Sequence, residues 1–367
     1  MITIRLDVRR AAAVAGIVVA VALAASVTTL MFRYAFRPSH TAARVQTTAS
    51  PVASPVETSP SANPQLGSIA GCPTGQLVTT SDELTQALAS AAPGTVIVMQ
   101  AGTYSGNFVA KNSGTEAAPI TLCGARDAVI DGGDIKVGYT FYLSTVDWWK
   151  VMGFTIQGGQ KGLVADHAHH NLIKGLFVRN IGDEGIHLRE FSTDNTVDGN
   201  TVRNTGLHNK KFGEGIYVGT AHSNWCKYTS CAVDNSDRNV ISNNDISNTT
   251  AENIDIKEGT TGGVIENNHL SGVGMVRSAA SAWINVKGNS WTVTGNVGVT
   301  SIKDGFQVHE VYKGWGLNNV FRTNRAEVNG PGYGFYVQSR SLAATIACDN
   351  VAVGAASGLS NQSCGGA

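Results

Sequence analysis

A four-residue phrase recurs along the second half of the chain, with apolar residues at its second and fourth positions. Its seven copies begin at Gly162, Gly185, Gly215, Asn253, Trp283, Gly305 and Gly334. Apolar residues at alternate positions are typical of a β-strand that buries one face. Successive copies lie 22 to 38 residues apart, so the shortest interval sets one coil and the excess lies in loops. This period, with short strands, predicts a solenoid.

A second repeated phrase precedes these strands, as in 195–200 and 264–268. Several short strands in each coil, stacked in register, are the pattern of a parallel β-helix. Ahead of the repeats, Thr80 and Glu83 form a capping box that predicts a helix over 80–91, covering the open end of the core. We therefore predict an all-β fold, a single-stranded right-handed parallel β-helix with a short N-terminal capping helix. A leucine-rich repeat or a propeller would need leucine spacing or hairpin turns that are missing here.

The N-terminal part of the chain has a different composition. Residues 1–10 contain three arginines and are expected on the cytoplasmic side. Residues 11–32 carry no charge and are long enough to cross a bilayer, so we expect a transmembrane signal anchor, with a signal peptide as the alternative. Residues 33–71 hold five of the nine prolines among Ser, Thr and Ala, which predicts a disordered linker. Residues 72–367 then form the β-helix domain.

The six cysteines indicate an oxidising compartment. None lies in a Cys-x-x-Cys pair, so three disulfides are favoured over a metal or redox site. Proximity in sequence pairs Cys226 with Cys231, Cys348 with Cys364, and Cys72 with Cys123, although six cysteines allow 15 pairings. The domain is therefore expected outside the cell, either anchored to the membrane or secreted.

The charges are balanced and sparse. Lys plus Arg and Asp plus Glu both number 27, and charged residues make up 15% of the chain. A nucleic-acid binder would need a basic excess, so that class is excluded. A monomer is expected.

Two outward columns of side chains follow from the strand alternation. The first contains His187, Tyr217, Asp255, Asn285, Gln307 and Tyr336, and the second contains Arg189, Lys257, Lys287 and His309. Cations pair with carboxylates, and sugar rings stack on aromatic rings. The columns therefore predict a binding strip for an anionic polysaccharide. Its expected substrate-binding residues are His187, Tyr217, Asn285, Gln307, His309 and Tyr336.

An acidic column precedes the strands and includes Glu184, Glu214 and Glu252. Glu214 and Glu252 belong to successive coils, and Asp255 is the outward residue of the second coil. Oxygen ligands in a loose geometry suit Ca²⁺, so we predict a calcium site made of Glu214, Glu252 and Asp255. The alternative is that these acids close turns or pair with Lys and Arg across coils.

A family resemblance lies in the first coils. The stretch from Ala101–Tyr104 through Ala118–Leu122 to Val129–Gly132 resembles the first coils of secreted β-helix polysaccharide lyases of families six and nine. Family six contains alginate lyases and chondroitinase B, and family nine contains pectate lyases. The resemblance implies an extracellular lyase that cleaves a uronate-containing polysaccharide by calcium-assisted β-elimination.

Glu252 and Lys257 keep a five-residue spacing found in family six. There the Glu binds calcium and the Lys is the base, so the resemblance implies these roles here. Where family six presents a catalytic Arg on the next coil, this chain has Lys287. We expect Lys257, Lys287 and Arg189 as the catalytic group, with Lys287 and Ca²⁺ lowering the pKa of Lys257.

Other functions stay open. A non-catalytic, membrane-tethered glycan-binding protein would use the inserted loop 219–238, with Trp225, as a binding lid. A uronan epimerase is favoured only by 307–310, which keeps the second half of an epimerase motif. The paired aspartates and the Gly-His-Gly of polygalacturonases are missing, which disfavours a glycoside hydrolase.

Overall fold

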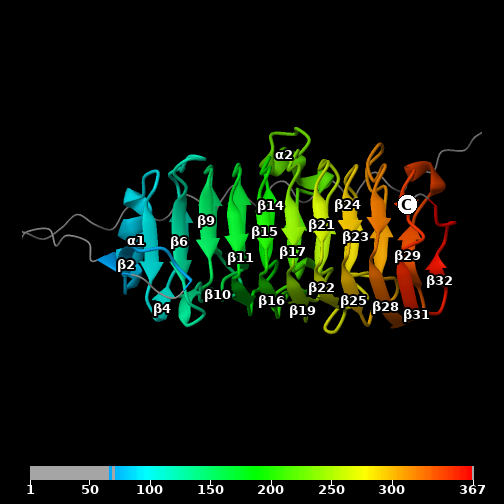
Figure 1. Cartoon of the computed structure of the whole chain (residues 1–367), viewed down its shortest axis with the longest axis horizontal. Coiled ribbons are helices and arrows are strands. Elements are labelled where there is room, and N and C mark those ends of the chain that lie inside the picture. The colour runs from blue at the N-terminus through cyan, green and yellow to red at the C-terminus, as the bar shows by residue number, and fades with distance from the viewer. Residues whose placement is uncertain (1–65, 68–70, 366–367) are drawn as a thin grey trace, which may run out of the picture. The chain divides into compact units, whose positions relative to one another are not determined.

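The computed structural model describes residues 66–67 and 71–365, and it folds them into a parallel β-helix (Figure 1). The chain passes through three sheets in turn, which we call sheets A, B and C. Strands in each sheet pair in parallel, except that β1 pairs antiparallel with β2. The predicted fold class is confirmed. The predicted segments 1–10, 11–32 and most of 33–71 lie outside the described residues.

The strands have the following bounds. Sheet A contains β1 (Leu66–Gly67), β2 (Gly75–Val78), β3 (Val96–Met99), β6 (Ile120–Gly124), β9 (Trp149–Met152), β12 (Leu172–Lys174), β15 (Thr196–Asp198), β18 (Val240–Ser242), β21 (Val264–Glu266), β24 (Thr292–Thr294), β27 (Val320–Arg322) and β30 (Thr345–Ile346). Sheet B contains β4 (Gly102–Ser105), β7 (Ala128–Asp131), β10 (Thr155–Gln157), β13 (Phe177–Arg179), β16 (Thr201–Arg203), β19 (Asp245–Ser247), β22 (His269–Ser271), β25 (Val297–Val299), β28 (Arg325–Gly330) and β31 (Val351–Ala355). Sheet C contains β5 (Phe108–Ala110), β8 (Tyr139–Ser144), β11 (Lys161–Asp166), β14 (Ile186–Arg189), β17 (Ile216–Val218), β20 (Ile254–Ile256), β23 (Ile284–Val286), β26 (Phe306–Val308), β29 (Tyr333–Val337) and β32 (Gly358–Ser360).

The recurring phrase forms the strands of sheet C, and its apolar residues stack inside the solenoid. Ile186 pairs with Ile216, and Ile254 pairs with Ile284, which are all fully buried. Burying one such side chain is worth about 1.5–3 kcal/mol, and the same gain is repeated coil after coil. This repetition explains how strands of three or four residues remain in register.

Buried asparagines form a second stack at the turn between sheets A and B. Asn268 donates through Nδ2 to Asn296 Oδ1 at 2.9 Å and to the Ile241 carbonyl at 2.9 Å, and its Oδ1 accepts from Asn244. Each amide therefore satisfies backbone groups that a turn would leave unpaired. The asparagines are structural, as the turn chemistry indicates.

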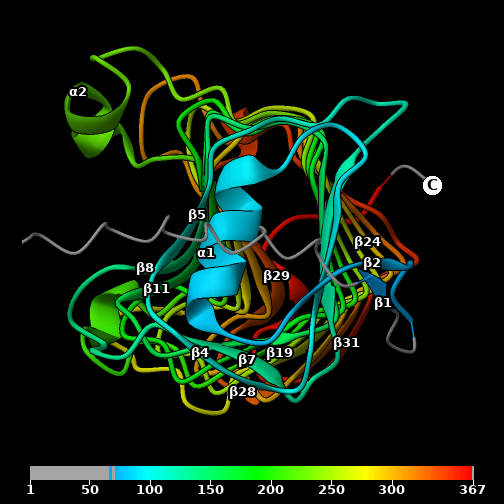
Figure 2. The same cartoon turned by 90° about the vertical axis from the view of Figure 1, so that its left-hand side faces the viewer.

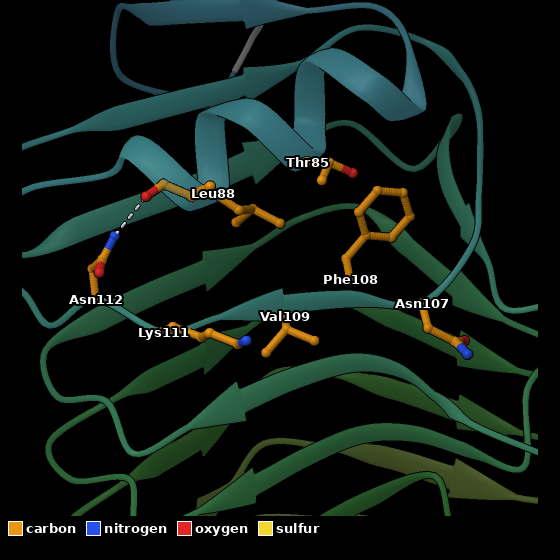
Figure 3. Close-up of a pocket in the computed structure, with 8 residues that line it drawn as sticks. Thr85, Leu88, Asn107, Phe108, Val109, Lys111 and Asn112 are labelled. Atoms are coloured by element: carbon orange, nitrogen blue, oxygen red, sulfur yellow. Dashed lines mark hydrogen bonds between the residues drawn. The ribbon is translucent and has the colours of Figure 1, made fainter.

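The N-terminal end of the core is covered by α1 (Ser81–Ser90), which lies across the open end in Figure 2. The capping box of Thr80 and Glu83 is present, and Leu84 and Leu88 are buried. The predicted capping helix is confirmed. A pocket lies between α1 and the edge strand β5 (Figure 3), and it is lined by Thr85, Leu88, Ala89, Asn107, Phe108, Val109, Lys111 and Asn112. It contains no acidic side chain, and it lies at the first coil, away from the two predicted columns.

The linker boundary needs a correction at its C-terminal end. Leu66 and Gly67 form β1 and pair with Gln76 and Gly75 of β2, although both were assigned to the linker 33–71. Ordered strand pairing therefore begins before Cys72. A two-residue strand carries no periodic signal, so composition alone could not place this boundary.

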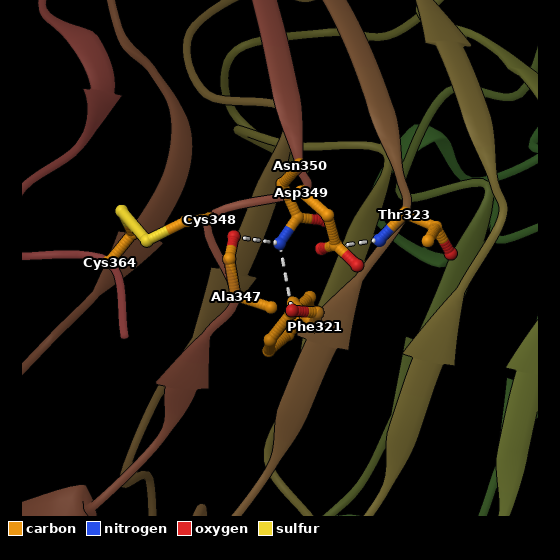
Figure 4. Close-up of a disulfide and its surroundings, with 7 residues drawn as sticks. All are labelled: Phe321, Thr323, Ala347, Cys348, Asp349, Asn350 and Cys364. Atoms are coloured by element: carbon orange, nitrogen blue, oxygen red, sulfur yellow. Dashed lines mark hydrogen bonds between the residues drawn. A yellow bond between two sulfur atoms is a disulfide. The ribbon is translucent and has the colours of Figure 1, made fainter. Parts of the chain in front are cut away.

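All three predicted disulfides are present, joining Cys72 to Cys123, Cys226 to Cys231 and Cys348 to Cys364. Figure 4 shows the last of them beside Asn350, the final member of the asparagine stack, which donates to the Ala347 and Phe321 carbonyls. This bond ties the C-terminal segment to the last coil. Three bonds in one domain are typical of secreted proteins.

Residues 71–365 contain four further short helical segments: η1 (Lys210–Phe212), η2 (His222–Asn224), α2 (Trp225–Tyr228) and η3 (Arg340–Leu342). The longest helix in 71–365 has ten residues. Over the described part of the chain, no helix has the length and apolar character needed to cross a membrane.

Candidate active site on the outer face of sheet C

The register of sheet C brings the predicted columns together. His187 pairs with Tyr217, Tyr217 with Asp255, Asp255 with Asn285, Asn285 with Gln307, and Gln307 with Tyr336. The second column runs beside the first, two residues further along the chain, at or just past the end of each strand. The predicted neighbours are therefore confirmed across six coils.

Burial divides these residues in a way that alternation alone did not indicate. Arg189, Asp255, Lys287 and Gln307 are each at most 6% exposed, although they lie on the outward side of their strands. Tyr217, Lys257, His309 and Tyr336 remain partly exposed. The latter group is therefore the part of the strip that a substrate can reach.

Asp255 is the centre of the site. Its Oδ2 lies 2.7 Å from Lys257 Nζ and its Oδ1 lies 2.5 Å from Lys287 Nζ. Burial by itself would raise the pKa of Asp255, but Lys257 and Lys287 lower it below its ordinary value. Asp255 is therefore an anion that two ammonium groups share.

The expected lowering of the Lys257 pKa is wrong in direction. Burial alone would lower it, but Asp255, Tyr217 and Glu214 together raise the pKa of Lys257 well above its ordinary value. The ammonium also lies 5.0 Å from the centre of the Tyr217 ring, in a cation–π contact. Lys257 is therefore positively charged in the free protein.

Tyr217 lies between Lys257 and His187. The rings of His187 and Tyr217 meet edge to face at 4.2 Å, and His187 Nε2 lies 3.1 Å from the Gly219 carbonyl oxygen. Burial raises the pKa of Tyr217 well above its ordinary value, and burial lowers the pKa of His187 well below its own. At neutral pH the site therefore holds a protonated phenol beside a neutral imidazole.

Glu214, Glu252 and Asp255 form an acidic trio, because each offers an oxygen within 4.8 Å of the others. Burial and the neighbouring acids raise the pKa of Glu214 well above its ordinary value and that of Glu252 to a smaller degree. The Glu252 Oε1 accepts from Asn285 Nδ2 at 3.2 Å. The predicted calcium ligands are thus brought together.

A calcium ion does not fit this trio as expected. Ca²⁺ needs six to eight oxygen ligands at about 2.3–2.6 Å, and the trio supplies three side chains. Both oxygens of Asp255 already contact ammonium groups at 2.7 and 2.5 Å. A divalent cation there would face Lys257 and Lys287 at close range, so the alternative of acids paired with lysines across coils describes the geometry better.

Arg189 belongs to a separate cluster on the neighbouring coils. It binds both oxygens of Asp166 at 2.7 and 2.9 Å and the Tyr139 hydroxyl at 2.9 Å. Its guanidinium also lies 4.4 Å from the Tyr228 ring centre. Arg189 is therefore held by these partners, and no interaction among the described residues joins it to the lysines around Asp255. Its predicted catalytic role stays a prediction.

The remaining predicted residues lie beyond Lys287. Gln307 is held by Asp304 and Ser281 at 2.7 and 2.9 Å, so it is structural. His309 Nδ1 lies 2.8 Å from Asn285 Oδ1. Burial, aided by Lys287, lowers the pKa of His309 to about 4. Tyr336 lies 5.9 Å from the His309 ring and extends the reachable strip by one coil.

Two loops that leave sheet C toward sheet A meet beside this strip, and sequence reasoning missed their contact. His222 stacks on Tyr312 at 4.9 Å, and the ring of Trp225 meets Tyr312 at 5.4 Å. His222 Nδ1 lies 2.8 Å from the buried carboxylate of Glu258. Figure 2 shows α2, within the predicted lid loop, projecting from the coils. The only hint in the sequence was the aromatic content of both loops.

Comparisons with known proteins agree with this fold. Residues 139–310 match the family described as the right-handed β-helix region, which confirms the handedness. The crystal structure of an alginate lyase from Paenibacillus sp. str. FPU-7 is 36% identical, covers 78% of this chain and 97% of its own, and superimposes with a TM-score of 0.72.

Two more distant structures are a pectate lyase, 18% identical with a TM-score of 0.50, and a rhamnogalacturonan lyase, 14% identical with a TM-score of 0.56. The first covers 72% of both chains, and the second covers 71% of this chain and 75% of its own. These two show the fold alone. No curated protein sequence matches the chain.

Proposed function

The chain belongs to the right-handed parallel β-helix superfamily of polysaccharide lyases, and from that membership we propose that it cleaves an anionic, uronate-containing polysaccharide outside the cell by β-elimination. The observation that carries the proposal is the arrangement of Tyr217, Lys257 and Lys287 around Asp255. Both lysines contact this one aspartate, and a uronate brings a carboxylate with which an ammonium group can pair. The three disulfides support the extracellular setting.

β-Elimination requires the uronate carboxylate to be neutralised, so that the proton on the adjacent carbon becomes acidic. Lys257 is partly exposed, and Lys287 lies on the next coil against the same aspartate. We assign neutralisation to the partly exposed Lys257, with the charge of the buried Lys287 acting beside it, because preorganised charges in a partly dry site stabilise a developing anion strongly.

Proton transfer is assigned to Tyr217 and Lys257. The pair lies in contact on the reachable part of the strip, with the ammonium 5.0 Å from the ring centre. One member takes the proton from the substrate carbon and the other donates a proton to the leaving glycosidic oxygen. Both hold their protons in the free protein, so one must first lose its proton to the solvent.

The N-terminal assignment remains part of the proposal. Residues 11–32 and the proline-containing segment 33–65 have the composition of a membrane anchor and a tether. We propose that they hold a monomeric lyase domain at the outer cell surface, and the sequence is the support for this. A secreted form would follow if the segment is cleaved.

The test is an incubation of the full-length protein with alginate, polygalacturonate, and chondroitin or dermatan sulfate. Alginate comes first because the 36% identical structure is an alginate lyase. The readout is the ultraviolet absorbance of the unsaturated uronate product, compared with that of a Lys257→Met variant. A rise for one polymer that the variant abolishes supports the proposal. No rise with any polymer, from folded protein that still binds one, would instead support a glycan-binding protein.

A further inference from the structure

The acidic trio of Glu214, Glu252 and Asp255 has the side chains that a cation site requires. All three side chains are at most 6% exposed, and their oxygens lie within 4.8 Å of one another. Glu214 Oε2 has no hydrogen-bond partner within residues 71–365. A buried carboxyl oxygen without a partner is costly, so the cluster leaves room for one more donor or cation at Glu214.

Lys287 supplies positive charge from the next coil. Asp255 pairs with Asn285, and the lysine two residues further reaches back to Asp255 Oδ1 at 2.5 Å. Lys287 is 6% exposed, and burying an ammonium group is repaid only by close anionic partners. Its charge also acts on Glu252, where it lowers the pKa that burial raises. Lys287 is thus placed as a cation bound by Asp255, the member of the trio that it contacts.

An ammonium group and a divalent cation compete for the same oxygens. Lys257 and Lys287 together bring two positive charges to Asp255, which equals the charge of one Ca²⁺. An ammonium group donates three hydrogen bonds and needs fewer oxygens than Ca²⁺ does. Three carboxylates therefore offer enough oxygens to bind a lysine ammonium group. While both lysines contact Asp255, they leave too few free oxygens for Ca²⁺.

We propose that Lys287 is a built-in cation that closes a latent divalent-cation site, so that the native protein needs no metal and loss of Lys287 opens the trio to Ca²⁺. In the variant, Asp255 Oδ1 is released and Glu214 Oε2 still has no partner. The Ca²⁺ ion then takes oxygens from the trio and completes its shell with water. The cation exchange does not depend on the proposed lyase function, whereas its effect on turnover rests on that function.

The binding test is calorimetric titration of the full-length protein with Ca²⁺. The native protein is expected to show no saturable binding at millimolar Ca²⁺. Lys287→Met keeps the side-chain length without the charge and is expected to bind with a Kd on the order of 10⁻⁴ to 10⁻³ M. Adding Asp255→Asn to that variant should abolish the binding. Lys174→Met, which breaks the exposed pair with Asp198, is the matched control and should bind nothing.

A second measurement, of thermal stability, tests the proposal even if Lys287→Met folds poorly. Ca²⁺ should raise the thermal midpoint of Lys287→Met, and also that of Lys287→Gln, which keeps a hydrogen-bond donor, while leaving the native midpoint unchanged. Saturable Ca²⁺ binding by the native protein would overturn the proposal. So would a folded Lys287→Met that neither binds Ca²⁺ nor is stabilised by it. In the lyase assay, a chelator should leave the turnover of the native protein unchanged. If the native protein cleaves no polymer, the proposed lyase function fails, but the Ca²⁺-binding result still tests the cation exchange.

Discussion

Lys287 Nζ lies 2.5 Å from Asp255 Oδ1, although the two residues are 32 positions apart in the chain. The solenoid produces this contact, because parallel pairing of β20 with β23 places each residue beside its counterpart one coil away. Lys257, the residue directly after β20, approaches the other oxygen of Asp255 from the same coil as the aspartate. One carboxylate thus binds two ammonium groups, of which Lys257 is partly exposed and Lys287 is buried.

Replacing the Tyr217 hydroxyl should abolish most of the turnover while leaving substrate binding intact. Tyr217→Phe keeps the ring that contacts Lys257 and His187 but removes the group assigned to proton transfer. Loss of a general acid or base costs about 10² to 10⁴ in rate. The check is kcat on the active polymer, with affinity measured separately by calorimetry. A variant that loses affinity and keeps kcat would show that Tyr217 only binds sugar.

The repeated phrase was enough to predict the solenoid and the neighbours within each column, because parallel stacking converts sequence period directly into spatial contact. It could not predict that Asp255 and Lys287 are buried. Whether they are buried depends on the way in which the long side chains of neighbouring coils fold over one another. The partners of Arg189 also could not be predicted from the repeats, because Tyr139 precedes the first copy of the phrase and Tyr228 lies in an inserted loop.

The pKa of Lys257 also could not be predicted from the column pattern. From sequence, Lys287 on the next coil would lower the pKa of Lys257 by like-charge repulsion. In the structure Asp255 lies between them and contacts both at 2.7 and 2.5 Å, which reverses the sign. A column pattern shows which residues are neighbours, but not which side chain is inserted between two others.

The turnover rate should rise with pH through the neutral and mildly alkaline range. The pKa values of Tyr217 and Lys257 are both raised in the folded protein, so the base form is scarce at neutral pH. Its fraction increases about tenfold for each pH unit below that pKa. The measurement is kcat against pH in buffers of constant ionic strength.

A different profile would point to a different base. His309 has a pKa of about 4 and a ring nitrogen that Asn285 does not bind, so it is already neutral above pH 5. A kcat that is flat from about pH 5 upward, and is lost in His309→Ala, would assign the base to His309 in place of the Tyr217 and Lys257 pair.

Interrupting the asparagine stack should lower stability without changing the site. Asn268 is fully buried and makes hydrogen bonds to Asn296, Asn244 and the Ile241 carbonyl. Asn268→Ala leaves several of these groups unpaired, which should cost about 1–3 kcal/mol of unfolding free energy. Chemical denaturation with circular dichroism measures the loss. The exposed Asn235→Ala is the control and should be close to neutral, and equal stabilities would mean that water replaces the missing amide.

Removing the Tyr312 ring should weaken substrate binding more than it slows the chemistry. Tyr312 is 45% exposed, and its ring stacks on His222, which the buried Glu258 carboxylate holds at 2.8 Å. An exposed ring with a fixed neighbour offers a flat, preorganised surface to a pyranose ring. It makes no contact with Tyr217, Lys257 or Lys287 among the interactions of the described residues.

Tyr312→Ala is therefore expected to raise KM about three- to tenfold, equivalent to the roughly 0.5–1.5 kcal/mol of an aromatic contact, with kcat nearly unchanged. Tyr312→Phe keeps the ring and should behave like the native protein. A long polymer contacts both the lysines and the two loops that carry His222 and Tyr312. The increase in KM should therefore be smaller for the shortest cleavable oligosaccharides. A fall in kcat with KM constant would mean that the His222 and Tyr312 contact positions the catalytic lysines through the loops and does not bind sugar.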